Sequence, residues 1–204
     1  HALLLVLVWL AKENRDGKIL LTATVNVAVD NLLNRFRVDK LNFHDSFADA
    51  FSKESVVLRR YGTRLSKDFE KALEDLHLDV ICKVDAAGFP ALWIDDARYR
   101  AEVNSADLLA GTLGSLSLGG VIPKEVFGTA VLEENGQTWE CESIQALHRS
   151  QCGVLIGDHK QLKKSFTEPK LQRTRFGSSL MERLAEVPGV GVCTLDQNYR
   201  SHPE

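Results

Sequence analysis

The stretch VLIGDHKQLKK, residues 154–164, places a short apolar run directly before a glycine, an acid and a basic segment. A short, continuous apolar run is typical of a strand buried in a parallel sheet. Open α/β sheets bind their ligands beyond the carboxyl ends of the strands, and Asp158 and Gln161 follow the run at that position. A strand running into an exposed turn is the commoner alternative, so the choice rests on the other segments.

Apolar runs of this kind alternate with helical patterns along the chain. Apolar strands are predicted in residues 18–23, 55–62, 106–115, 129–140, 152–158 and 190–204, the third leading into a loop of small residues. Helices are predicted from His1 and in residues 25–36, 66–78, 140–149 and 177–187, with Ser66 as a plausible N-cap. Strands that alternate with helices predict an α/β fold with a parallel sheet.

The composition limits the class of protein. With 204 residues, of which 44% are hydrophobic and 26% charged, the chain suits one large soluble domain or a domain with an insertion. The net charge of −3 argues against wholesale nucleic-acid coating but allows a local basic groove. Residues 160–175 contain six basic residues and a single acid, Glu168; the basic residues are Lys160, Lys163, Lys164, Lys170, Arg173 and Arg175. This run is a candidate for phosphate contact, although a solvated loop is the commoner interpretation.

The cysteines and the apolar start indicate the compartment. Four cysteines lie far apart without a C-x-x-C pair, which predicts reduced thiols in an intracellular protein, cytoplasmic or nuclear. The apolar run at residues 1–10 is shorter than the ~20 residues that span a bilayer and lacks the basic start of a signal peptide. We therefore expect a buried helix there and no membrane contact.

Three predicted strands end in polar side chains: Glu133 and Glu134 after one, Asp158 and Gln161 after the next, and LDQNYRSHP, residues 195–203, after the last. Paired carboxylates after an apolar strand suit a magnesium–nucleotide site, because one acid can hold the hydrated metal while its neighbour orients the attacking water. A nearby Gln can sense the terminal phosphate, and an Arg can stabilise its developing charge. Paired glutamates alone are more often surface acids, but the order and spacing of the three motifs favour the site.

Four stretches together resemble the first RecA-like motor domain of a superfamily 1 helicase: LLTATVNVAVDNLL (20–33), VLEENGQ (131–137), LIGDHKQL (155–162) and LDQNYRSHPE (195–204). They are similar to the motifs T-A-P-S-N-x-A-V-D-N, D-E-A-x-Q, G-D-x-x-Q-L and Q-Y-R-M-H-P of the Upf-like group, which contains the nonsense-mediated-decay helicase and senataxin. The likeness covers most of residues 1–38 and 106–204, and VLRRYG, residues 57–62, matches loosely between them. Glu133 replaces the usual Asp, which could detune magnesium geometry, and Asn198 replaces the usual Gln.

The resemblance implies a role for each motif residue in a protein that binds ATP and Mg²⁺. In the nucleotide half, the resemblance makes Glu133 the metal ligand and Glu134 the water activator. Gln161 would sense the terminal phosphate, and Arg200 would be the arginine finger. Tyr199 would stack on the adenine, and Asp158 would be a further nucleotide contact. In the other half, the resemblance places the backbone of single-stranded RNA or DNA against Thr24, Asn26 and Thr112. Asn26 as a mere helix N-cap remains an alternative.

The P-loop motif G-x-x-x-x-G-K-[ST] does not occur in residues 1–204. The resemblance places that loop just before His1, and a second RecA-like domain after Glu204. We therefore expect a partial first motor domain over 1–204, with an insertion at about 39–105 and the start of the link to the second domain at about 196–204. The intact parent is expected to be an ATP-dependent helicase, whereas this chain alone should bind ATP poorly. A non-catalytic nucleic-acid-binding module or a decayed helicase remnant is the alternative.

Overall fold

The computed structural model describes residues 17–37, 56–62, 65–83, 96–117, 122, 127–161, 170, 174 and 177–196. Several predictions fall elsewhere in the chain. The helix expected from His1, the residues Tyr199 and Arg200, and most of the basic run at 160–175 lie outside the described residues.

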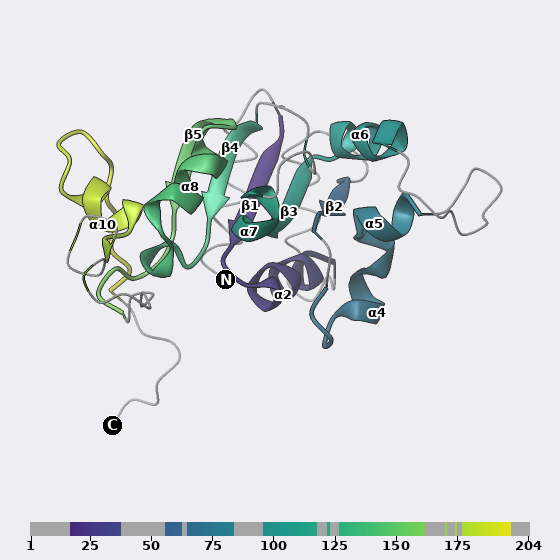
Figure 1. The fold of residues 1–204 in the computed structure, drawn as a ribbon, viewed down its shortest axis with the longest axis horizontal. Helices are drawn as coiled ribbons and strands as arrows, with labels where there is room; N and C mark the ends of the chain where they lie inside the picture. The colour runs from purple at the N-terminus through teal and green to yellow at the C-terminus, as the bar shows by residue number, and fades with distance from the viewer. Residues whose placement is uncertain are drawn as a thin grey trace.

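Five parallel strands form one sheet in the order β2-β3-β1-β4-β5 (Figure 1). The strands are β1 (Ile19–Ala23), β2 (Leu58–Arg60), β3 (Leu108–Thr112), β4 (Phe127–Leu132) and β5 (Ser150–Leu155). Every residue of β1, β3 and β4 is buried, as expected for strands covered on both faces. The predicted α/β fold with a parallel sheet is confirmed.

Helical segments connect the strands: α2 (Asn26–Arg37), α4 (Glu70–Leu73), the 3₁₀ turn η1 (Glu74–Leu76), α5 (Leu78–Ile81), α6 (Asp96–Ser105), α7 (Leu113–Ser117), the 3₁₀ turn η2 (Asn135–Gln137), α8 (Glu140–Leu147) and α10 (Leu180–Ala185). Parallel neighbours require such crossovers, because the chain must return to the start of the next strand. No helix within the described ranges is long and apolar enough to cross a membrane.

Alternate residues of β1 enter two separate cores. Ile19 and Leu21 pack with Val29 and Leu33 of α2 on one face of the sheet. Leu20 belongs to the cluster on the other face, together with side chains of α6, α7 and α8: Tyr99, Val103, Leu113, Leu116 and Ala146. The period-two alternation of a strand explains why neighbouring residues are divided in this way.

The predicted helix over 66–78 is wrong as a single helix. The segment divides into α4, η1 and α5, and His77 between them has extended backbone angles (φ −78°, ψ 118°). His77 forms a parallel bridge with Arg60 of β2, so pairing with the sheet overrides the helical pattern there. Ser66 is not an N-cap, because α4 begins only at Glu70 and the buried Oγ of Ser66 has no hydrogen-bond partner among the described residues.

The strand predicted in residues 55–62 is present as β2, which pairs with β3 in the main sheet. Two other segments differ from the expectation. The residues after β3 form α7 rather than a loop. The final strand is wrong over residues 190–196, which have no strand structure and expose Leu195 to 74%. A strand requires a hydrogen-bonded neighbour, and none of the described strands pairs with this segment.

Candidate functional site

Four strands end at one level of the sheet. Ala23 of β1 pairs with Thr112 of β3, Thr22 pairs with Leu132 of β4, and Leu132 pairs with Leu155 of β5. The segments that follow these strands therefore meet along one border of the sheet, in the order Thr112, Thr24–Asn26, Glu133–Glu134, Asp158–Gln161. We call this row of residues the strand-end edge. It brings together all the predicted site residues that the structure describes.

Asn26 is the first residue of α2, and its side chain is partly exposed. Its Oδ1 accepts a hydrogen bond from Arg60 Nη2 at 2.7 Å. The helix thus begins at Asn26 itself, and the side chain contacts β2 rather than capping its own helix. Thr24, two residues earlier, is partly buried in the turn between β1 and α2.

Thr112 has a structural role at the strand-end edge. Its side chain is only 8% exposed, and its Oγ1 accepts a hydrogen bond from the N–H of Ser115 at 3.2 Å. This is the geometry of an N-cap for α7, which begins at Leu113. The Oγ1 also lies 2.9 Å from Ser115 Oγ. The hydroxyl of Thr112 is therefore engaged within its own turn.

Glu133 is the first residue after β4 and is tied to β1 by its backbone. Its N–H donates to the carbonyl oxygen of Thr22 at 2.8 Å. Its side chain is half-buried, and its buried Oε2 has no hydrogen-bond partner among the residues that the structure describes. Burial, and then the neighbouring charge of Glu134, raise the pKa of Glu133 to about 7.

The acid pair fits a magnesium ion. Mg²⁺ prefers oxygen ligands, keeps several waters and is bound by one or two carboxylates together with substrate phosphates. The buried Oε2 of Glu133, which has no partner among the described residues, is such a ligand, and a nearby cation would favour its ionised form and so oppose the effect of burial on its pKa. No group of three or more His, Cys, Asp or Glu that could form a closed metal cage occurs in the described part of the chain.

Glu134 is exposed and has a left-handed backbone, with φ 56° and ψ 32°. Among the described residues it is the only non-glycine residue with a positive φ. Such strain is found preferentially at functional sites. The turn directs the chain from β4 into η2 directly after the acid pair.

The loops that follow β4 and β5 are locked together. The N–H of Asn135 donates to the carbonyl oxygen of Ile156 at 2.9 Å. A Cβ added to Gly136 would lie 2.3 Å from the carbonyl oxygen of Asp158, so only glycine fits there. Asn135 is fully buried, and its Nδ2 donates to Ser143 Oγ of α8 at 2.8 Å.

Gln137 is a site residue that was missed in the sequence. Its Nε2 donates to Oε1 of the exposed Gln161 at 3.4 Å, which joins the acidic loop to the predicted phosphate sensor. The signal was present, because Gln137 stands at the Gln of the motif D-E-A-x-Q. Asp158 is also exposed, and its Oδ1 accepts from the N–H of Lys160 at 2.9 Å.

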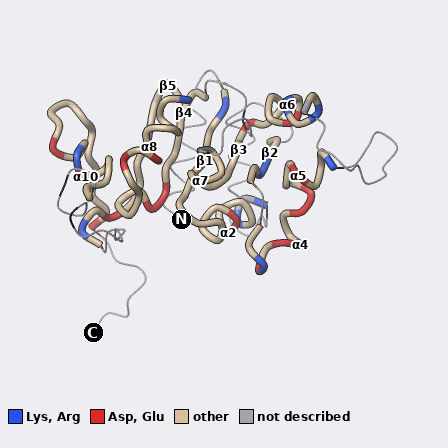
Figure 2. Tube along the Cα trace, viewed as in Figure 1, with Lys and Arg blue, Asp and Glu red and all other residues tan. Residues whose placement is uncertain are grey.

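Over the described ranges, charge does not gather on a single side of the chain trace. Basic and acidic residues are interspersed along α4, α6 and α10 (Figure 2). Lys160 and Lys170 of the predicted basic run are exposed. The described residues thus provide the acids of the strand-end edge, whereas most of the basic run lies outside them.

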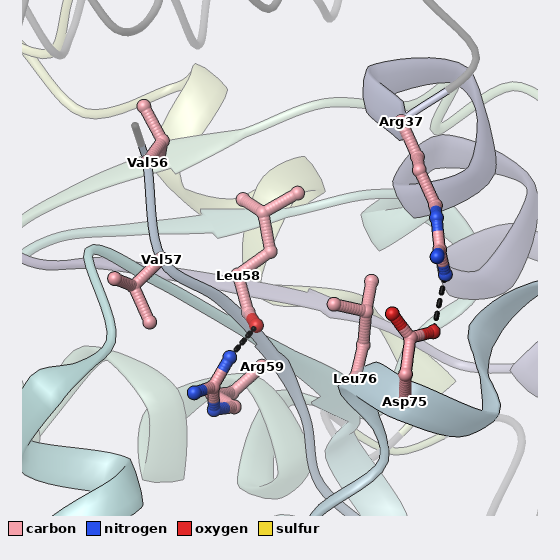
Figure 3. A pocket seen from close by; sticks show the side chains of 7 residues that line it. All are labelled: Arg37, Val56, Val57, Leu58, Arg59, Asp75 and Leu76. Atoms are coloured by element: carbon pink, nitrogen blue, oxygen red, sulfur yellow. Dashed lines mark hydrogen bonds and ion pairs between the residues drawn. The ribbon is translucent and has the colours of Figure 1, made fainter. Parts of the chain in front are cut away.

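A pocket of about 320 Å³ lies beside the first residues of β2, away from the strand-end edge (Figure 3). It is lined by Arg37, Val56, Val57, Leu58, Arg59, Asp75 and Leu76. Its cations already have partners, because Arg37 pairs with Asp75 and Arg59 Nε donates to Glu102 Oε2 at 2.8 Å. The pocket is therefore separate from the predicted chemistry.

Comparisons with known proteins found similar sequences in three mammals. The chain is similar to the DNA-binding protein SMUBP-2 of Mus musculus (26% identical over 209 aligned residues), Rattus norvegicus (26%) and Mesocricetus auratus (28%). The alignments cover 91% of this chain and 21% of each relative, so the chain spans about a fifth of their length.

A solved structure, the Pyrococcus furiosus Hef helicase domain, matches 82% of this chain and 34% of its own, with 12% identity and a TM-score of 0.32. A likeness at this level carries no inference about fold or function. No protein-family model matches the chain.

Proposed function

We propose that this chain is part of the first RecA-like motor domain of a Upf-like superfamily 1 helicase. The parent would couple ATP hydrolysis to movement along single-stranded nucleic acid. The strand-end edge carries the proposal, because it brings Thr112, Thr24–Asn26, Glu133–Glu134 and Asp158–Gln161 to one border of the parallel sheet. The similarity to SMUBP-2 over most of the chain supports the same proposal.

The nucleotide half of the site is formed by the loops after β4 and β5. Glu133 would hold a magnesium ion, which when bound would neutralise charge on the nucleotide phosphates. Glu134 is exposed and adjacent, so its carboxylate is placed to accept a proton from an attacking water. Gln161 would contact the terminal phosphate, and its hydrogen bond with Gln137 would couple the presence of that phosphate to the position of the acidic loop.

The nucleic-acid half is formed by the turn after β1. Asn26 and Thr24 carry groups that can donate to phosphate oxygens, and such contacts hold a strand irrespective of its sequence. The name of the relatives makes single-stranded DNA the first ligand to test, with RNA beside it.

A backbone hydrogen bond connects the acidic loop after β4 to the end of β1. Glu133 N–H donates to the carbonyl oxygen of Thr22, which precedes Thr24 by two residues. A shift of the acidic loop would therefore act on the start of the nucleic-acid half through this bond. We propose that, through this bond, a change of the bound nucleotide alters the contacts to the single-stranded nucleic acid.

A binding module without turnover is the second candidate. The observation behind it is Glu133 in place of the usual Asp, because the longer side chain changes the geometry that Mg²⁺ requires. The two candidates differ in one measurable property. A motor must bind a divalent cation through Glu133, whereas a binding module needs only to bind single-stranded nucleic acid.

Two binding experiments on the purified chain test the proposal. Fluorescence anisotropy with labelled ~15-nucleotide strands of deoxythymidine or uridine should show binding that Asn26→Ala weakens and Asn34→Ala, on the same helix but outside the motif, leaves unchanged. Electron paramagnetic resonance of Mn²⁺ should show a bound ion that is lost in Glu133→Gln. Absence of strand binding would contradict the proposal, and strand binding with Mn²⁺ binding unaffected by Glu133→Gln would favour the module.

A further inference from the structure

Arg60 is a fully buried arginine at the end of β2, and its guanidinium contacts two residues of α2 and the next residue of its own segment. Its Nε donates to Asp30 Oδ1 at 2.7 Å, its Nη2 donates to Asn26 Oδ1 at 2.7 Å, and its Nη1 donates to the carbonyl oxygen of Tyr61. Asp30 is also fully buried, so the guanidinium and the carboxylate form a paired charge inside the protein. A buried charge persists only when it is paired and hydrogen-bonded in this way.

This contact fixes which way the Asn26 amide faces. A guanidinium has only donors, so the atom of Asn26 that meets it must be the carbonyl oxygen Oδ1. The NH₂ group on the same carbon is then directed away from Arg60. That group is a pure donor, and the phosphate oxygens of a nucleic-acid backbone are pure acceptors. Because Asn26 is partly exposed, its NH₂ is accessible at the strand-end edge.

The next two residues hold the neighbouring part of the edge. The Tyr61 hydroxyl donates to the carbonyl oxygen of Thr112 at 3.3 Å. Gly62 has a φ of +109°, and a Cβ there would lie 2.7 Å from Ser115 Oγ. Residues 60–62 therefore brace both segments to which the nucleic-acid contacts were assigned, Asn26 directly and Thr112 through its backbone.

We propose that Arg60 is a positioning residue for strand binding, because it orients the Asn26 amide so that the NH₂ group donates to a backbone phosphate. The inference rests on the proposed nucleic-acid contact at Asn26. Arg60 would thus act in binding as well as in stability, and the Asn26 NH₂ group would recognise a phosphodiester oxygen.

The substitution Asn26→Asp separates this role from a structural one. A carboxylate can still accept from Arg60, so the fold should be kept, but it has no donor and would repel phosphate. We expect Asn26→Asp to lose at least about tenfold in affinity for a labelled ~15-nucleotide single strand, with an unchanged or higher urea midpoint. The control Asn34→Asp makes the same charge change at a partly exposed site of α2 outside the motif and should bind nearly as tightly as the wild type.

Arg60→Lys tests the positioning residue itself. Lysine retains the positive charge beside Asp30 but cannot contact Asp30 and Asn26 with a planar fork. We expect a weaker affinity for the strand and a loss of the distinct NMR shifts of the Asn26 side-chain NH₂. If Arg60→Lys does not fold, Asn26→Asp decides the question alone.

The outcomes separate the two proposals. Wild-type binding that Asn26→Asp leaves intact would overturn the inference and leave the proposed function standing. A wild-type chain that binds neither DNA nor RNA strands would overturn both. Loss of affinity in Asn26→Asp, with the Asn26 NH₂ signals of the wild type shifted by the strand, supports the inference.

Discussion

The backbone N–H of Glu133 donates to the carbonyl oxygen of Thr22 at 2.8 Å, so the acid after β4 is anchored to the strand that precedes the nucleic-acid half. The side chain of Glu133 is half-buried, and its Oε2 has no hydrogen-bond partner among the described residues. The carboxyl group therefore has a high proton affinity, from which the first prediction follows.

Glu133→Gln should stabilise the chain at high pH and have little effect at low pH. The pKa of Glu133 rises from 4.5 to about 7 in the folded protein, through burial and then through the charge of Glu134. Between these values the unfolded state releases its proton first, so the stability of the wild type falls as pH rises from about 4.5 to about 7. Glutamine carries no charge at any pH and avoids this loss.

Urea unfolding of both proteins at about pH 5 and about pH 8 checks the prediction. The midpoint of the variant should exceed that of the wild type only at the higher pH. Glu186→Gln, at an exposed position after α10, is the matched control and should show no such difference. Equal midpoints for Glu133→Gln and the wild type at both pH values would contradict the raised pKa.

Divalent cations should reverse this effect. A cation that binds Glu133 favours the ionised carboxylate, so Mg²⁺ should raise the melting temperature of the wild type near neutral pH and release protons as it binds. The increase should be absent in Glu133→Gln. An equal increase in both proteins would show that the ion binds elsewhere.

Glu134→Gly should stabilise the fold and remove the proposed water-activating group. A non-glycine residue in the left-handed region costs about 1 kcal/mol, which glycine avoids. Glu134→Ala is the control, because it removes the carboxylate and keeps the strain. Chemical unfolding should therefore rank the glycine variant above the alanine variant, and the reverse order would refute strain at this position.

Gly136→Ala should destabilise the chain by about 1–3 kcal/mol, because its Cβ would meet the carbonyl oxygen of Asp158 at 2.3 Å. The two loops would have to separate, which should also shift the amide signals of Asp158 and Gln161. Gly114→Ala is the control, since a Cβ there meets nothing within 4 Å. A Gly136→Ala variant as stable as the wild type would show that the loops are not locked together.

Loss of the cap at Ser179 should selectively weaken α10. The Ser179 Oγ accepts from the N–H of Glu182 at 3.1 Å and is the N-cap of this short helix. Ser179→Ala should cost about 1 kcal/mol and speed amide exchange within α10. Ser178→Ala, one residue outside the cap, serves as the comparison, and identical exchange in the two variants would argue against the cap.

The strands that could be predicted from sequence are those with uninterrupted apolar runs. β1, β3 and β4 are buried on both faces, so their composition carries the signal without any knowledge of their neighbours. The residues after these strands were predicted from motif order, and the parallel register brings them to one edge. The cap of α10 was likewise readable, because serine before an apolar helical pattern is a local signal.

The features that were missed depend on distant partners. Arg60 in the sequence Arg59-Arg60 resembles a surface residue, and it is buried only because Asp30 and Asn26 lie beside it in the fold. The helical pattern over residues 66–78 is broken because His77 pairs with Arg60. No local pattern contains such long-range contacts, and this explains why the buried guanidinium became visible only in the structure.

Amide NMR of the chain with two separate ligands is the most direct test that the strand-end edge is a motor site with two halves. A single-stranded ~15-nucleotide oligomer should shift the signals of Thr24, Asn26 and their neighbours, and Mn²⁺ should broaden those of Glu133, Glu134 and Asp158. Responses confined to adjacent parts of this one edge are the predicted result. Strand-induced shifts at the opposite end of the sheet, around Lys18 and Phe127, with no broadening at Glu133, would contradict the account.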